Sequence, residues 1–224
     1  MATNKEELRE LCKKLNLFHL SRIDSFDIDI KDKQAYFKYL LEYEFEERHK
    51  KVMNKNRMAS HLPKIKGELK FKGIDEWNFE DVKKLKWLEN NVNLIIIGKC
   101  GSGKTALATT LGNLAIEKGY KVYYIKVDEY LHILNNVNDY KEKNVYAKIK
   151  ESDLIILDEL MYLPMSTEDV VKLYRSIMYL SEVRSFIFIT NRRLQEWIDL
   201  IEDRHTMETV VDRIANGSKQ IFFN

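Results

Sequence analysis

Short apolar runs alternate with amphipathic stretches in the second half of the chain. Five strands are expected, at residues 93–97, 121–125, 153–157, 185–190 and 219–223. Helices are expected between them, at residues 105–118, 127–136, 167–183, 194–201 and 206–215. Several strands are almost entirely apolar, which is typical of strands buried on both faces. The alternation therefore predicts an α/β fold, with a parallel sheet flanked by helices.

The first half of the chain is predicted to be helical instead. Leu8, Leu11, Cys12 and Leu15 follow the spacing of one helix face, and a longer helix is expected from about residue 32 to residue 58. Pro63 marks the far limit of that second helix. Three regions are predicted: a small α-helical domain (1–62), a linker (63–90) and an α/β core (91–224).

Composition narrows the class of protein. The 224 residues are 45% apolar and carry 37 basic and 35 acidic residues, a net charge of +2. This balance excludes a disordered polyelectrolyte and a protein that binds nucleic acid through bulk charge alone. Neither a membrane-spanning run nor a secretory signal is visible, and the two cysteines are too few for a disulfide framework or a four-cysteine zinc site. A cytoplasmic protein is expected.

The basic residues are concentrated in one segment. Residues 48–72 hold nine basic residues against a single acidic one, Glu68. Such a run can be a solvated helix face and linker, or a patch that faces a phosphate backbone. The candidate DNA contacts are Lys50, Lys51, Lys55 and Arg57.

A phosphate-binding loop follows the first predicted strand. The residues from Gly98 to Thr105 read GKCGSGKT and satisfy the pattern G-x-x-x-x-G-K-[ST]. Glycines let several backbone N–H groups converge on phosphates, and the following helix adds the positive end of its dipole. Lys104 is expected to reach the β- and γ-phosphates and Thr105 to ligate Mg²⁺. The full candidate nucleotide-binding set is Gly98, Lys99, Cys100, Gly101, Ser102, Gly103, Lys104, Thr105 and Ala106.

Two carboxylates end the third predicted strand. Asp158 and Glu159 follow four apolar residues, and the carboxyl end of a buried parallel strand faces the ligand crevice. Asp158 is predicted to hold Mg²⁺, and Glu159 to orient or deprotonate the attacking water. A base positioned to activate water favours hydrolysis of the nucleotide over transfer of its phosphate to a small molecule, as in a kinase. Without the phosphate loop, a surface turn would be the simpler interpretation.

Two further residues are candidates for the catalytic machinery. Asn191 follows the fourth strand, where it could hydrogen-bond the γ-phosphate or water, or form a turn. Arg213 is the best-placed arginine to complete a neighbouring subunit's site, as happens in oligomeric P-loop ATPases. Arg192, Arg193 and Arg204 are alternatives to it.

Several of these segments resemble the IstB-like ATPases, helper proteins of insertion-sequence transposition that are related to DnaC-type helicase loaders and belong to the AAA+ class. The segments are 93–98, 103–108, 119–122, 153–160 and 162–164, together with Ile189–Asn191, Glu196–Trp197 and Asp212–Arg213. The resemblance covers essentially the whole chain. The run 157–164 and its spacing to Asn191 are far more specific than the phosphate loop.

The resemblance implies an AAA+ ATPase that binds ATP and Mg²⁺, forms homo-oligomers on duplex DNA and assists a transposase. It makes Asn191 a sensor residue and Arg213 an arginine finger. It places adenine near the linker before the first strand, where Trp77 and Phe79 are candidate contacts, with ordinary core packing as the alternative for both. The family pattern continues past the last strand to a second sensor arginine, whereas this sequence stops at Asn224. The alternatives are a loader with a replicative helicase as partner, a small-molecule kinase and a nucleotide-gated scaffold.

Overall fold

The computed structural model describes residues 5–23, 33–65, 76–162, 165–201 and 203–223. The chain forms two units, Met1–Lys55 and Asn56–Asn224, and each is described by itself. The predicted boundaries at residues 62 and 90 remain predictions.

The first unit is helical, as expected. It contains α1 (Lys5–Lys14), the short 3₁₀ helix η1 (Leu20–Arg22) and most of α2 (Lys33–Ala59). The buried carboxylate of Glu44 on α2 accepts hydrogen bonds from the backbone N–H groups of His19 and Leu20, both at 2.9 Å, and from Arg48 Nε at 2.7 Å. Burial opposes ionisation, but these three donors outweigh it and hold the pKa of Glu44 below its ordinary value. Glu44 therefore joins η1 to α2.

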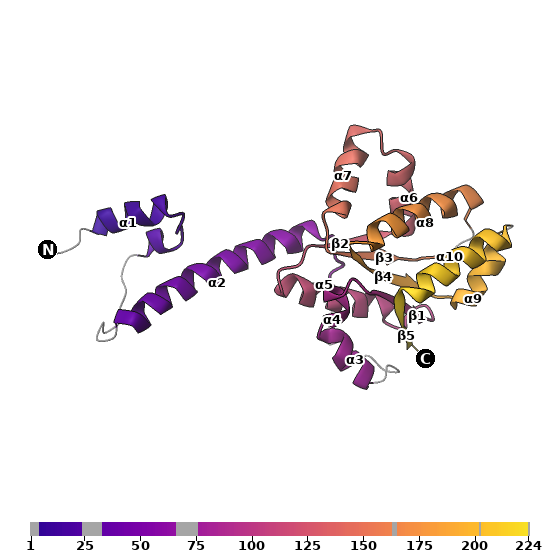
Figure 1. Ribbon diagram of the computed structural model, residues 1–224, viewed down its shortest axis with the longest axis horizontal. Coiled ribbons are helices and arrows are strands. Elements are labelled where there is room, and N and C mark those ends of the chain that lie inside the picture. The colour runs from indigo at the N-terminus through magenta and orange to yellow at the C-terminus, as the bar shows by residue number, and fades with distance from the viewer. Residues whose placement is uncertain (1–4, 24–32, 66–75, 163–164, 202, 224) are drawn as a thin grey trace. The chain divides into compact units, whose positions relative to one another are not determined.

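The second unit is built on a parallel sheet of five strands in the order β2-β3-β4-β1-β5 (Figure 1). The strands are β1 (Asn93–Gly98), β2 (Val122–Lys126), β3 (Leu154–Asp158), β4 (Ser185–Thr190) and β5 (Ser218–Phe223). All pairings are parallel, and β4 lies between β1 and β3. The predicted fold class is confirmed, and the expected strands differ from these by at most one residue at either end.

Alternating side chains of the strands enter two cores. On one face, Ile95, Ile155 and Phe186 belong to a buried cluster that includes residues of five helices. Those helices are α6 (Val127–Asn135), α7 (Tyr140–Lys150), α8 (Thr167–Ser181), α9 (Leu194–Trp197) and α10 (Arg204–Asn216). On the other face, α5 (Lys104–Glu117) packs so closely that a Cβ at its Gly112 would lie 3.1 Å from Ile156 Cδ1. Figure 1 shows α6 and α8 on one side of the sheet and α5 on the other.

Some helices were not expected from the sequence. These are α3 (Glu76–Lys83) and α4 (Lys86–Glu89), in the predicted linker, and α7, whose surface is mostly charged. The expected helix at 194–201 is a single α-helical turn, α9, followed by the 3₁₀ helix η2 (Ile198–Leu200). Short or mostly solvated helices lack a wide apolar stripe, so their periodicity is weak.

Within the part of the chain that the structure describes, no helix combines the length and the apolar character needed to traverse a bilayer.

Candidate active site

The order of the strands brings the predicted site residues together. Because β4 pairs with both β1 and β3, the loop after β1 and the carboxylates after β3 lie on either side of the end of β4. Asn191, which follows β4, lies between them. A cavity of about 250 Å³ at this edge of the sheet is lined by Cys100, Gly101, Lys104, Thr105, Asp158, Glu159, Tyr162, Ile189, Thr190 and Asn191.

The phosphate loop has the expected curled backbone. Gly101 and Gly103 have φ values of 75° and 101°, in the left-handed region that residues with a Cβ rarely enter. The buried side chain of Lys104 folds over the loop and donates hydrogen bonds to the carbonyl oxygens of Gly98, at 2.7 Å, and Lys99, at 2.8 Å. Burial lowers the pKa of Lys104 below its ordinary value. A buried ammonium in a cavity is stabilised by an anion such as a phosphate.

Thr105 and Asp158 meet across the cavity. The Thr105 hydroxyl donates to Asp158 Oδ2 at 2.9 Å, although the two residues are 53 positions apart in the chain. A hydroxyl and a carboxylate beside a phosphate-binding loop are the oxygen donors that Mg²⁺ prefers. The residues present therefore fit the predicted magnesium site.

Asp158 is also held from β2. The Tyr124 hydroxyl donates to the same oxygen, Asp158 Oδ2, at 2.7 Å, and the backbone N–H of Glu159 donates to Oδ1 at 2.7 Å. Burial and the neighbouring Asp158 carboxylate raise the pKa of Tyr124, so the phenol remains a donor. Both oxygens of the Asp158 carboxylate are thus oriented.

Glu159 lies beside a lysine of β2. Lys126 Nζ donates to Glu159 Oε1 at 2.8 Å, and this pairing raises the pKa of Lys126. The backbone of Glu159 is left-handed, with φ of 63°. This conformation costs about 1–2 kcal/mol in a residue with a Cβ. Glu159 is therefore held at a strained turn directly after the buried strand, with its carboxylate at the cavity.

Asn191 has an unsatisfied polar atom at the cavity. Its Oδ1 is buried without a hydrogen-bond partner among the described residues. An unpaired buried amide costs free energy unless a ligand or water completes it. This favours a polar contact over the alternative of a turn-forming asparagine.

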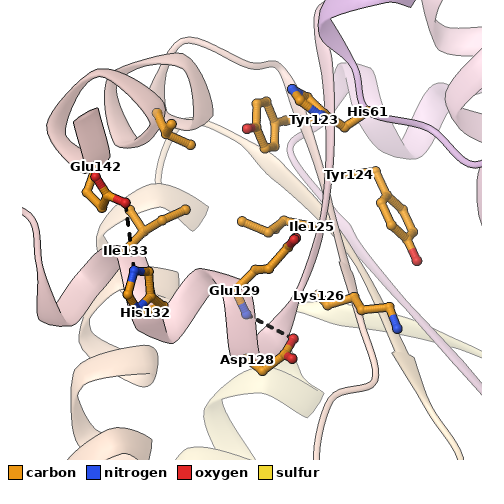
Figure 2. Close-up of a pocket in the computed structure, with 11 residues that line it drawn as sticks. His61, Tyr123, Tyr124, Ile125, Lys126, Asp128, Glu129, His132, Ile133 and Glu142 are labelled. Carbon is orange, nitrogen blue, oxygen red and sulfur yellow. Dashed lines mark hydrogen bonds and ion pairs between the residues drawn. The ribbon is translucent and has the colours of Figure 1, made fainter.

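A second, larger cavity of about 610 Å³ lies against β2 and α6 (Figure 2). Its walls include Tyr123, Ile125 and Glu129, and a pair formed by His132 Nε2 and Glu142 Oε1 at 3.7 Å. The ring of His61 lies tilted against that of Tyr123, with centroids 5.0 Å apart and an interplanar angle of 40°. Tyr124 and Lys126 also border this cavity, and Figure 2 shows their side chains extending from the opposite side of β2 to that of Tyr123.

The structure does not bring the candidate arginines into the phosphate cavity. Arg213 is exposed on α10, with its guanidinium 6.0 Å from the ring centre of Tyr174. Arg204 pairs with Asp199 at 3.2 Å, and Arg193 lines a separate hollow beside β5. Arg192 has a buried Nε without a partner among the described residues. An arginine that acts on a neighbouring subunit must lie outside its own cavity, as Arg213 does.

The candidate adenine contacts are only partly described. The side chain of Trp77 lies outside the described residues. Phe79 is on α3, where the Lys83 ammonium lies 4.6 Å from the centre of its ring. Phe79 does not belong to the described lining of the phosphate cavity.

The candidate DNA contacts lie on α2. Lys50 pairs with Glu47 at 2.7 Å, and Lys51 and Lys55 are exposed on one helix face. Arg57, in the second unit, lies 3.7 Å from Glu117. In the first unit, a hollow of about 470 Å³ combines basic and apolar side chains, namely Phe18, His19, Arg22, Arg48, Lys51 and Val52.

Sequence reasoning missed Tyr124, Lys126 and Tyr162. Tyr124 and Lys126 lie at the end of a predicted strand, and Tyr162 lies in one of the segments that resemble the family, but neither signal assigns a contact to these residues. The sequence does not say that β2 is the neighbour of β3, so the contacts of Tyr124 and Lys126 with the carboxylates could not be inferred.

The sequence was compared with family models and with known proteins. Residues 21–223 match the family model described as "IstB-like ATP binding protein". A Pseudomonas aeruginosa protein named as the ATP-binding protein of insertion sequence IS21 is 28% identical over 228 residues, covering 95% of this chain and 84% of that protein. The corresponding IS232 protein of Bacillus thuringiensis subsp. berliner is 30% identical over 159 residues, covering 65% of this chain and 63% of the relative.

Among solved structures, the DnaC helicase loader superposes with a TM-score of 0.53 at 18% identity, covering 76% of this chain and 99% of that chain. At this identity the likeness shows a shared fold, the P-loop AAA+ type of sheet.

Proposed function

This chain belongs to the family of IstB-like ATP binding proteins, and from that premise we propose that it hydrolyses ATP while assembled on DNA, as a helper of a transposase. The ATP-binding role of AAA+ type follows from the family itself. Hydrolysis, DNA association, self-assembly and the transposase partner are the parts that we propose.

One observation carries the proposal of hydrolysis. Lys104, Thr105, Asp158, Glu159 and Asn191 line a single cavity, although they come from three separate parts of the chain. A cation, a hydroxyl–carboxylate pair and a second carboxylate are the groups that phosphoryl transfer to water requires.

Each side chain has a proposed task. The loop N–H groups and Lys104 bind and orient the β- and γ-phosphates, which places the terminal phosphorus for in-line attack. Glu159 accepts the proton of the attacking water, and Asn191 hydrogen-bonds the γ-phosphate or that water. Arg213 of a neighbouring subunit stabilises the charge that develops on the transferred group.

Thr105 and Asp158 would hold Mg²⁺. When bound, the ion supplies charge neutralisation and orientation of the phosphate oxygens. Asp158 is suited to this task because Thr105 and Tyr124 already fix the direction of one oxygen and the Glu159 N–H fixes the other.

The partners are proposed from two sources. The relatives are named for insertion sequences, which supports a transposase as the protein partner. The exposed basic face of α2 and the basic hollow next to it support contact with DNA phosphates. The site lacks an arginine of its own chain in the described lining of the cavity, which supports assembly into an oligomer that completes it.

The ATPase rate and the particle mass, measured with and without long duplex DNA, test the whole proposal. We expect DNA with ATP to produce an assembly of many subunits and to raise the rate per chain, because each site gains a neighbour's arginine. ADP in place of ATP is the control, and it should leave the assembly small. A monomer with steady turnover that ignores DNA would favour a small-molecule kinase, and assembly without turnover would favour a scaffold.

The partner needs an experiment of its own. Capture of purified transposase by the ATP-bound chain is expected, and capture of a hexameric replicative helicase instead would identify a helicase loader. The likeness to DnaC does not decide between them, because it shows the fold alone.

Reversing charge on α2 should change how salt affects DNA binding. Each phosphate contact contributes about −0.9 to the slope of log K against log salt, so Lys51→Glu with Lys55→Glu should reduce the slope by about 2. Arg48 is left intact because it holds Glu44. The matched control is Lys84→Glu with Lys86→Glu, exposed lysines near α4 that change net charge equally. An equal slope in both double variants would exclude this face of α2.

A further inference from the structure

The second cavity has an apolar wall contributed by β2, α6 and α7. Ile125 and Ile133 line it and are buried in the core cluster, against which Val145 of α7 also packs. Its volume of about 610 Å³ lies within the range of roughly 300–1,000 Å³ that is typical of small-ligand sites. It shares no described lining residue with the phosphate cavity. The second cavity can therefore hold an aliphatic chain without entering the nucleotide site.

The Tyr123 hydroxyl is an unsatisfied polar group of this cavity. The side chain is only 6% exposed, and its hydroxyl has no hydrogen-bond partner among the described residues. Burial and the charge of Glu129 raise the pKa of the phenol, so it stays protonated. In Figure 2 the Tyr123 side chain lies on the same side of β2 as Ile125 and Glu129. A buried hydroxyl is costly unless a ligand or water completes it, so Tyr123 presents an acceptor oxygen to the cavity.

Glu142 of α7 presents a carboxylate to the same cavity. Its side chain is only 17% exposed, and His132 Nε2 lies 3.7 Å from Oε1, which is longer than a hydrogen bond. Figure 2 shows the two side chains facing each other. A largely buried carboxylate is costly unless a cation or close donors reach it. Glu142 can therefore accept a charge-assisted hydrogen bond from a ligand.

The charges around the cavity select a cation. Its lining holds the carboxylates of Asp128, Glu129 and Glu142 against one ammonium, that of Lys126, which already donates to Glu159 at 2.8 Å. This negative excess disfavours an anion. In the part of the chain that the structure describes, no three His, Cys, Asp or Glu residues are grouped so that they could hold a metal ion. An organic cation fits these walls better than an anion or a metal.

The rim of the cavity at His61 is held by backbone contacts. The Tyr124 N–H donates to the carbonyl oxygen of Ser60 at 2.8 Å, which joins the residue before His61 to the outer edge of β2. His61 itself has φ of 56°, a conformation that is uncommon in residues with a Cβ and that persists where the surroundings impose it. Its ring lies against that of Tyr123. The shape of the cavity is therefore preformed.

We propose that the second cavity is a binding site for an organic cation on an aliphatic stem, an alkyl ammonium or guanidinium group, which donates to the Tyr123 hydroxyl and the Glu142 carboxylate. Ile125, Ile133 and Val145 take the stem. A free polyamine and a basic side chain of another protein share this chemistry. The site is independent of the proposed hydrolysis, because its walls do not include the groups that bind the phosphates.

Titration of the full chain, without nucleotide or DNA, with two cationic probes tests the site. The probes are spermidine, for a free amine, and acetyl-Ala-Arg-Ala-amide, for a basic side chain; acetyl-Ala-Gln-Ala-amide is the neutral control. The chain has five histidines, of which His61 and His132 line the cavity. Their imidazole C–H resonances should shift saturably with a cationic probe, and those of His19, His49 and His205 should not. The probe with the higher affinity identifies the source of the cation.

Tyr123→Phe and Glu142→Gln remove the proposed acceptors while keeping the size of each side chain. Each variant should raise the Kd of the cationic probe by about tenfold, the lower end for a hydrogen bond to a charged group. Glu182→Gln removes an exposed carboxylate after α8 and is the matched control for charge, so it should leave the Kd unchanged. Unshifted resonances of the histidines outside the cavity show that a variant is folded.

Three results would overturn this site. The first is the absence of a saturable shift of His61 and His132 with either cationic probe. The second is equal binding of the neutral peptide, which would mean that the charge of the ligand plays no part. The third is a Kd in Glu142→Gln that equals the Kd in Glu182→Gln, because the cation would then be held by the general acidity of the surface.

Discussion

Glu159→Gln is expected to slow ATP hydrolysis by about 10²–10⁴-fold, the contribution of a positioned general base. The amide keeps the size of the side chain and a hydrogen bond to water, but it cannot accept the proton. ATP affinity should change little, because Lys104 and the loop bind the phosphates. The ATP-bound assembly on DNA should therefore accumulate, which particle-mass measurements and single-turnover assays can follow together.

Two further variants serve as controls for Glu159→Gln. Lys104→Ala should lose ATP affinity and with it the assembly, and normal affinity in this variant would show that the site is wrongly assigned. Glu129→Gln removes an exposed carboxylate of α6 that lines the second cavity, and it should hydrolyse ATP at the ordinary rate. Equal losses in Glu129→Gln and Glu159→Gln would contradict a specific role for Glu159.

Arg213→Ala is expected to reduce DNA-stimulated hydrolysis by about 10³-fold while ATP binding persists, because an arginine finger contributes 10³–10⁵ in rate. Arg213 is exposed on α10 and does not belong to the described lining of its own phosphate cavity. Its effect should therefore appear only in the assembly. Steady-state turnover at saturating DNA, compared with nucleotide affinity, measures this difference.

Mixing two inactive variants gives the sharper measurement. A mixture of Arg213→Ala and Glu159→Gln chains should regain part of the activity, since Glu159→Gln subunits donate Arg213 to the intact sites of Arg213→Ala subunits. Arg204→Ala, which breaks an exposed pair with Asp199, is the matched control and should remain active. If the mixture does not recover activity and Arg204→Ala is inactive, Arg204 rather than Arg213 is the arginine that acts on the neighbouring site.

The site features that could be predicted from the sequence are those formed by short, continuous segments of the chain. The loop from Gly98 to Thr105 is one such segment, because its backbone conformation depends on glycines at fixed spacing. The pair Asp158–Glu159 is another, since carboxylates after an apolar run must lie at the end of a buried strand. The positions of the strands followed in the same way from burial on both faces.

The helices that were not predicted have weak hydrophobic periodicity. The helix α7 buries little beyond Ile149, so its sequence shows no wide apolar stripe. The short helices α3 and α4 lie in a region predicted as a linker. Their formation depends on packing, as with Trp87 and Leu88, which are each 4% exposed.

The sequence by itself determined the phosphate loop, the carboxylate pair and the alternation that makes a parallel sheet, because each depends on residues adjacent in the chain. Only the tertiary structure decided the order of the strands. That order brings Asn191 between the loop and the carboxylates, and it brings Tyr124 and Lys126 of β2 against Asp158 and Glu159. The physical reason is that pairing between distant strands is set by the packing of the whole sheet and its helices, which no local pattern records.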